Sequence, residues 1–236
     1  MAINVIVSNV GVAGPAGTNA ASEIASTLLL QEDWIASTSA GQNGWTSSSS
    51  NGGANSIISA ESNKIGICRL STGGSSAAGY SNIYLGINCV VLGNGRITIE
   101  ALVRFPTLST SGERYAARIG LGDALTGDFS YGVWLEYAEA TSANWLICSN
   151  NNSTATKTAS SVAVSENSWV KLKIVIAANG SSAEYFIDGT SIGTISSNLP
   201  TSITSPRINI TKSVGTSARF TEIDYYQLKY EFSTQR

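Results

Sequence analysis

The sequence predicts an all-β protein, an antiparallel β-sandwich, and three observations carry this prediction. In residues 170–176, apolar side chains alternate with lysines, the period of a strand that is buried on one face. Asn179 and Gly180 follow, a pair that tolerates the positive φ of a tight hairpin turn, and a second strand spans residues 183–187. Short apolar runs separated by polar turns recur along the chain, as they do in sandwiches and barrels.

Length and composition agree with one β-domain. The chain has 236 residues, 42% hydrophobic and 13% charged, with 23 glycines, so it can bury a single core and has many turn formers. The 14 basic and 16 acidic residues form no basic stripe, which argues against a nucleic-acid partner. Serine, threonine, asparagine and glycine therefore cover much of the surface, for example in residues 46–53 and 149–161, as in stable extracellular or virion proteins.

The first 25 residues differ from the rest. Ile3, Val5 and Val7 alternate with other residues like a short strand, and residues 11–17 form a linker punctuated by glycine and proline. Residues 19–30 fit either a short helix or the first sandwich strand. We expect residues 1–25 to be an attachment strand and linker and residues 26–236 to be the sandwich. Another chain or a neighbouring domain would complete the unpaired strand.

No secretory signal peptide and no apolar stretch long enough to span a bilayer are visible, so we expect synthesis in the cytoplasm and no membrane insertion. Cys68, Cys89 and Cys148 are then expected to be buried, reduced thiols.

The remaining strands follow in order from Asp33. They are expected at residues 56–60, 64–70, 80–92, 96–105, 113–121, 129–137, 143–149, 169–178, 183–188, 191–195, 207–211 and 218–232. Strands 96–105 and 113–121 each place an apolar row on one side and charged side chains on the other. We expect them to be neighbours in one sheet, with a packed back and a polar front.

The final strand carries two carboxylates on its apolar side, Glu222 and Asp224. A carboxylate is not buried alone, so either a bulge near Asp224 changes the face or an arginine pairs with it. Arg219 and Arg207 are the candidate partners.

Several motifs resemble a known family. Trp169 stands at the start of a strand, and it is followed by the turn at residues 187–189 and the sequence NLP at residues 198–200. Together these motifs resemble the later half of a concanavalin A-like sandwich, a class that includes legume lectins and family 16 glycosidases. With residues 63–80 and 96–109, the series resembles the sandwich domain of bacteriophage tail-fibre, head-fibre and decoration proteins.

The resemblance implies a small fibre-type virion protein that docks through its amino terminus on other virion proteins. It also implies a concanavalin A-like jelly roll, a homotrimer and, as a possible ligand, a host-surface glycan. A capsid decoration or cement protein is the alternative, and a glycosidase similar to family 16 is a third.

An enzyme is not expected. Family 16 glycosidases use an E-x-D-x-E strand, but Tyr226 stands at the position of the second glutamate that would follow Glu222 and Asp224. The chain has no histidine, so triads that need one are excluded, and neither a metal site nor a cofactor is expected.

The aromatic residues offer the remaining candidate site. If the odd-numbered residues of strand 129–137 are core, Trp134 and Glu136 point outward near Arg118 and Trp145, and these four residues form a candidate glycan surface because rings stack on sugars. The alternative is that most of these rings fill the core or a subunit contact. Trp169 is expected in the core.

Overall fold

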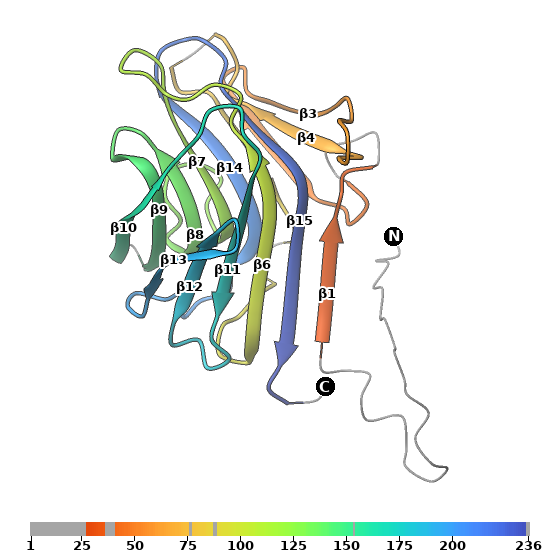
Figure 1. The fold of residues 1–236 in the computed structure, drawn as a ribbon, viewed down its shortest axis with the longest axis vertical. Helices are drawn as coiled ribbons and strands as arrows, with labels where there is room; N and C mark the ends of the chain where they lie inside the picture. Colours follow the sequence, from red (N-terminus) through yellow and green to blue (C-terminus); the bar gives the residue numbers. More distant parts are fainter. Residues whose placement is uncertain (1–26, 36–40, 76, 87–88, 153, 235–236) are drawn as a thin grey trace.

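Fifteen β-strands make up the regular structure of the described residues, which are 27–35, 41–75, 77–86, 89–152 and 154–234 of the computed structural model. No helix occurs among these residues. The strands form two antiparallel sheets stacked face to face (Figure 1). The predicted all-β sandwich is therefore confirmed.

The first sheet, called sheet A, has eight strands in the order β13-β12-β11-β6-β15-β4-β3, with β1 paired to β15. Their bounds are β1 Thr27–Glu32, β3 Ala54–Ile58, β4 Ile67–Ser71, β6 Gly95–Arg104, β11 Val170–Ile176, β12 Ala183–Ile187, β13 Thr190–Ile195 and β15 Phe220–Phe232. The predicted hairpin is present, because β11 pairs with β12 and Gly180 has a φ of 70° in the turn between them.

The second sheet, called sheet B, has seven strands in the order β10-β9-β8-β7-β14-β5-β2. Their bounds are β2 Thr46–Ser50, β5 Tyr80–Tyr84, β7 Arg114–Gly122, β8 Tyr131–Ala138, β9 Ser142–Asn151, β10 Thr154–Ala163 and β14 Ser205–Val214. One face of this sheet meets sheet A, and the opposite face carries the candidate site.

Every second side chain along the strands points inward, and these side chains fill the space between the sheets. The inward residues of β6 and β11 are buried apolar side chains: Ile97, Ile99, Ala101, Val103, Val170, Leu172, Ile174 and Ile176. Two tyrosines also tie the layers together by hydrogen bonds. The hydroxyl of Tyr226 donates to the carbonyl of Gly120 at 2.9 Å, and that of Tyr185 donates to the carbonyl of Cys148 at 2.7 Å.

The prediction that residues 96–105 and 113–121 are neighbours in one sheet is wrong. β6 lies between β11 and β15 in sheet A, whereas β7 lies between β8 and β14 in sheet B. Both strands turn an apolar row into the same core, and a strand of either sheet needs such a row. Alternation therefore identified the buried side of each strand but not its sheet.

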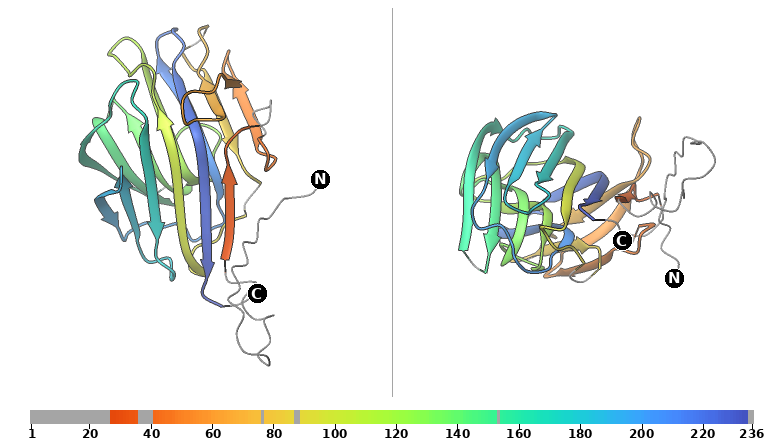
Figure 2. Two further views of the ribbon diagram at one scale, coloured as in Figure 1. Left: turned by 45° about the vertical axis from the view of Figure 1, so that its right-hand side comes forward. Right: turned by 90° about the horizontal axis from the view of Figure 1, so that it is seen from below.

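The amino-terminal end of the described chain is a sandwich strand. β1 pairs with β15 from Thr27↔Glu231 to Glu32↔Tyr226, and Figure 2 shows the two strands side by side. Residues 27–30 are therefore strand and not helix. Leu28 and Leu30 pack against the core. Residues 1–26, with the predicted attachment residues Ile3, Val5 and Val7, lie outside the described residues.

Two strands come from segments that had been expected only as polar surface. β2 is TSSSS and β10 is TATKTASSVA, and each lies at an edge of sheet B. An edge strand pairs on one side only, and these two expose most of their side chains. Their sequences therefore lack the apolar rows that mark the inner strands.

A bulge interrupts β15 at Asp224, as predicted. Ile223 pairs with Val103 and Tyr225 with the adjacent Leu102, so the strand gains one residue at this point.

Among the described residues there is no helix of the length and apolar character that crossing a membrane requires.

Candidate ligand-binding site

The outer face of sheet B, which is turned away from sheet A, carries a row of polar side chains. Strand pairing sets Asn82 of β5 opposite Asn209 of β14, Asn209 opposite Arg118 of β7, and Arg118 opposite Glu136 of β8. The row faces outward because the neighbours along each strand, such as Ile208, point into the core. Four adjacent strands thus bring hydrogen-bonding groups into one line.

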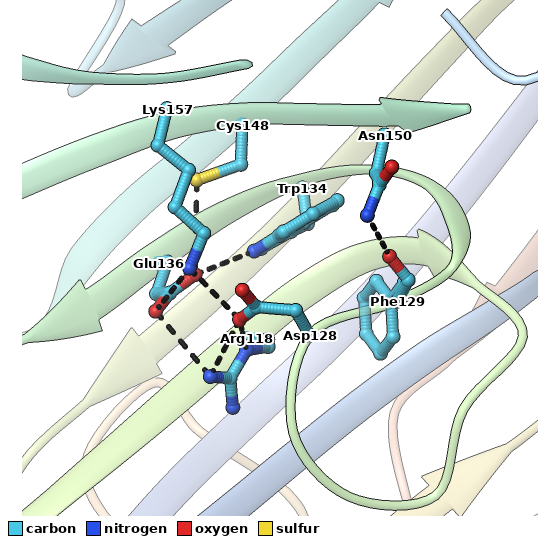
Figure 3. Close-up of polar contacts among 8 residues, drawn as sticks. All are labelled: Arg118, Asp128, Phe129, Trp134, Glu136, Cys148, Asn150 and Lys157. Carbon is cyan, nitrogen blue, oxygen red and sulfur yellow. Dashed lines mark hydrogen bonds and ion pairs between the residues drawn. The ribbon is translucent and has the colours of Figure 1, made fainter. Parts of the chain in front are cut away.

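One end of this row is a partly buried ionic cluster, shown in Figure 3, in which Arg118 and Glu136 are buried and Asp128 is exposed. Arg118 Nη2 lies 2.9 Å from Asp128 Oδ1 and 3.4 Å from Glu136 Oε1. Lys157 Nζ lies 2.8 Å from Asp128 Oδ1 and 2.9 Å from Glu136 Oε2. The indole of Trp134 donates to Glu136 Oε2 at 2.8 Å. Two cations thus balance two carboxylates.

Charge also sets the protonation state of this cluster. Burial raises the pKa of Asp128, but Lys157 and Arg118 outweigh it, so the net effect is a lowered pKa. Burial likewise opposes the charged form of Lys157, yet Glu136 and Asp128 hold its pKa above the ordinary value. Both side chains therefore stay charged at neutral pH.

A loop covers this face, residues 123–130 between β7 and β8. The carboxylate of Asp123 accepts hydrogen bonds from the amides of Ser130 and Tyr131, at 2.8 and 3.2 Å, which closes the loop on itself. The ring of Phe129 packs so closely over β7 that a Cβ added to Gly122 would lie 2.4 Å from it. Glycine at position 122 is what admits the ring.

Beside the Asn82 end of the row lies a buried cation that forms no ion pair in the described residues. Arg207 of β14 lies next to this row, and its guanidinium stacks 4.4 Å from the ring centre of Tyr84. Its Nη1 donates to the carbonyl of Ala124 at 3.2 Å and to Asn82 Oδ1 at 3.4 Å. Within the described chain Arg207 forms no ion pair, and burial lowers its pKa.

Several buried polar atoms of this face have no hydrogen-bond partner in the described part of the protein. Four of them lie close together: Arg118 Nη1, Arg207 Nε, Asn209 Nδ2 and Asn209 Oδ1. Asn150 Oδ1 on β9 and Thr211 Oγ1 on β14 are two more on the same face. Asn209 is 0% exposed, and Arg118 and Arg207 are 6% and 5% exposed. Buried polar groups are nearly always paired, so a cluster of unpaired ones on one surface requires an explanation.

Three of the four predicted glycan-surface residues lie together and one does not. Arg118, Trp134 and Glu136 meet on the outer face of sheet B, but all three are buried, and loop 123–130 covers this face. Trp145 lies instead in the core between the sheets, with its ring centre 5.6 Å from that of Phe105. The alternation of β9 turns Trp145 inward, so its predicted place on this surface is wrong.

The carboxylate that resembled a glycosidase nucleophile is held by two arginines. Arg69 Nε donates to Glu222 Oε1 at 2.8 Å and Arg104 Nε donates to Glu222 Oε2 at 2.7 Å. The predicted partners Arg219 and Arg207 are therefore wrong, although an arginine pairing was expected. Glu222 is fully buried, and each of its oxygens accepts from a guanidinium. This carboxylate is arranged as a structural ion pair.

Two further side chains differ from expectation. Trp169 was predicted in the core, but it is half-buried and its indole donates to Glu61 at 3.0 Å, with the guanidinium of Arg104 4.6 Å from its ring centre. Cys89 is exposed. It was expected to be buried, as the other two cysteines are. In the described residues, no group of three or more acidic or cysteine side chains could hold a metal ion.

Solved structures with similar folds share little sequence with this chain. The SO2946 protein of Shewanella oneidensis MR-1, of unknown function, has a TM-score of 0.67 and 14% identity, with 90% of each chain covered. An endo-1,3-beta-glucanase from Streptomyces sioyaensis has a TM-score of 0.57 and 11% identity, covering 92% of this chain and 99% of that one. A carbohydrate esterase, vb_24B_21, from the Shiga toxin-encoding bacteriophage phi24B has a TM-score of 0.54 and 16% identity, covering 86% and 97%.

These similarities show that the fold is a concanavalin A-like sandwich, as the sequence resemblance implied. A comparison with curated protein sequences found no match. The family model described as "SO2946-like, C-terminal domain" matches residues 63–224, which is more than half of the chain. The chain therefore belongs to the SO2946-like C-terminal domain family.

Proposed function

We propose that this protein is a carbohydrate-binding virion protein of a bacteriophage, a small fibre-type protein that acts by contact and not by catalysis. The observation that carries the proposal is the set of unpaired polar atoms buried on the outer face of sheet B, at Arg118, Arg207 and Asn209. Carbohydrate ligands present many hydroxyl groups, and binding sites hold such ligands with a few precisely placed polar groups. A bound sugar would satisfy atoms that the protein leaves without partners.

Two comparisons support this proposal. One neighbour of the same fold is a bacteriophage carbohydrate esterase, and another is the carbohydrate recognition domain of Emp47p, with a TM-score of 0.58 and 10% identity. In the proposed arrangement residues 1–25 attach the protein to other virion proteins, with Ile3, Val5 and Val7 forming the docking strand. The sandwich then projects as part of a homotrimer made in the host cytoplasm.

The state of Glu222 argues against the glycosidase alternative. A retaining glycosidase needs one carboxylate free to attack the sugar and a second to protonate the leaving group. Both oxygens of Glu222 are held by arginines, and Tyr226, at the position of the second acid, is buried in the core with its hydroxyl bonded to Gly120. A contact function therefore fits this strand better.

A glycan array with the full chain tests the carbohydrate-binding role. We expect binding by the wild-type protein, and weaker binding by Asn209→Ala, because that substitution removes both unpaired atoms of the amide. Binding to no glycan on an array that includes bacterial surface polysaccharides would refute the carbohydrate role.

Electron microscopy of labelled phage particles tests the virion role. Label on the tail or on a fibre supports the proposal. Label spread over the shell would replace the fibre role by the decoration role, and absence from particles would refute both.

Light scattering at micromolar concentration checks the trimer separately, because a monomer would contradict it.

A further inference from the structure

We propose that Arg207, Asn209 and Arg118 form an anchoring site for the carboxylate of an acidic sugar, beneath loop 123–130 on the outer face of sheet B. This inference rests on the proposed carbohydrate function and specifies its ligand class. It follows from the charge balance of this face, its unpaired donors and acceptors, and the spacing of the three side chains.

The charge balance favours an anion. At one end of the row, Arg118 and Lys157 face Asp128 and Glu136, so this cluster is neutral. At the other end Arg207 adds one positive charge, and none of the described carboxylates pairs with it. Asp123 is the acidic neighbour that acts on it electrostatically, but its carboxylate is engaged by the amides of the loop. A buried cation is costly unless an anion joins it.

The unpaired atoms also select the ligand. At the proposed site three are donors, Arg207 Nε, Arg118 Nη1 and Asn209 Nδ2, and one is an acceptor, Asn209 Oδ1. The two oxygens of a carboxylate can accept from all three donors, and an adjacent sugar hydroxyl can donate to the acceptor. A neutral sugar would leave Arg207 without an ion-pair partner, and a carboxylate without hydroxyls would leave the acceptor unused.

The three side chains are close enough to share one ligand. Asn209 is directly opposite Arg118 across neighbouring strands, a placement that sets the Cβ atoms of a pair about 5 Å apart. Arg207 precedes Asn209 by two residues on the same face, which corresponds to about 7 Å along a strand. A carboxylate and one pyranose ring fit within this span.

Above Arg207 and Asn82, the loop is held by two hydrogen bonds that a ligand can replace, whereas the buried ring of Phe129 anchors its far end against Trp134. The carbonyl of Ala124 accepts from Arg207 and the carbonyl of Leu125 accepts from Asn82 at 3.1 Å. The side chain of Leu125 is 40% exposed, so it does not anchor the loop in the core. The carboxylate would take over the bond that Arg207 gives to Ala124, and the part of the loop around Ala124 and Leu125 would shift outward to admit the sugar.

Titration calorimetry with paired ligands tests the inference. The probes are oligosaccharides of galacturonic acid, glucuronic acid and sialic acid, each compared with its carboxyl-reduced neutral form. We expect the wild-type protein to bind at least one acidic form about 10- to 100-fold more tightly than its neutral form, because a hydrogen bond to a charged group has that effect. Arg207→Met should remove this preference. The control Arg96→Met, at an exposed arginine on β6, should retain it.

A second readout separates a ligand-binding arginine from a structural one. If the role of Arg207 is to bind an anion, Arg207→Met removes a buried cation that has no ion-pair partner, so the Tm of the ligand-free protein should stay the same or rise. A lower Tm would mean that Arg207 stabilises the fold and would overturn the inference. Binding that favours the neutral forms would also overturn it but leave the proposed carbohydrate function intact, whereas binding to none of the probes and to no array glycan would refute both.

Discussion

Glu222→Gln provides a direct test of whether the carboxylate of β15 is structural or catalytic. The substitution keeps the size of the side chain but removes the charge that pairs with Arg69 and Arg104. Arg104 retains Glu61 as a partner at 2.6 Å, whereas Arg69 is left without a carboxylate within the described chain. The expected result is a loss of stability without any loss of function.

The magnitude follows from burial. Removing one partner of a buried ion pair costs about 3 to 5 kcal/mol. The side chains of Arg69 and Arg104 are 34% and 14% exposed and the amide of glutamine still accepts one hydrogen bond, so the cost belongs near the lower end, at about 3 kcal/mol. For a chain of this size, that corresponds to a fall in Tm of about 6 to 12 °C.

Thermal unfolding followed by circular dichroism measures the effect. Glu231→Gln is the matched control, because its pair with Lys229 is exposed and should change stability by no more than about 0.5 kcal/mol. The reasoning is refuted if both variants melt within about 2 °C of the wild type. If the wild type released sugar from a polysaccharide and Glu222→Gln did not, the carboxylate would be catalytic and the contact function wrong.

Three further predictions concern protonation, thiol access and close packing. Burial raises the pKa of Asp224 to about 6 in the folded protein, so ionisation of this carboxyl group destabilises the fold. Asp224→Asn should therefore raise the free energy of unfolding in urea by about 2 kcal/mol at pH 7.5, and this gain should shrink toward pH 4. A gain that does not depend on pH would contradict the role of ionisation. A maleimide should label only Cys89 in the native protein, because Cys68 and Cys148 are buried. Mass spectrometry should find three labels after denaturation, and rapid labelling of all three cysteines in the native protein would contradict the packing. Gly66→Ala should lower the free energy of unfolding by about 2 kcal/mol, because the new Cβ would lie 2.3 to 2.6 Å from main-chain atoms of Asp33 and Trp34. Unchanged unfolding in urea would show that the chain relaxes to remove this contact.

The inner strands could be predicted from the sequence because each needs an apolar row. The β11–β12 hairpin and β6 have such rows, and their predicted bounds agree with the structure to within two residues. β2 and β10 have none, since an edge strand rich in serine and threonine resembles a loop in composition. The sheet to which a strand belongs depends on pairing between distant segments, and alternation holds no information about it.

The candidate site was predictable only in part, for the same reason. Parity along β8 placed Trp134 and Glu136 outward, and both lie on that face. Arg207 and Asn209 were missed, although their alternation with isoleucines in β14 gave the signal that they point away from the core. The approach of Lys157 to Glu136 depends on the pairing of β10 with β9, which no local pattern specifies.

The position of β15 has a consequence for biosynthesis. It follows every other strand in the sequence, yet it lies inside sheet A, where β6 flanks one side and β4 and β1 flank the other. While the ribosome is still translating residues 220–232, the two flanking parts of the sheet cannot join, and their unpaired edges stay exposed to aggregation. Folding of this domain is therefore completed after its last strand has emerged from the ribosome, and nascent chains stalled before residue 220 should remain sensitive to protease.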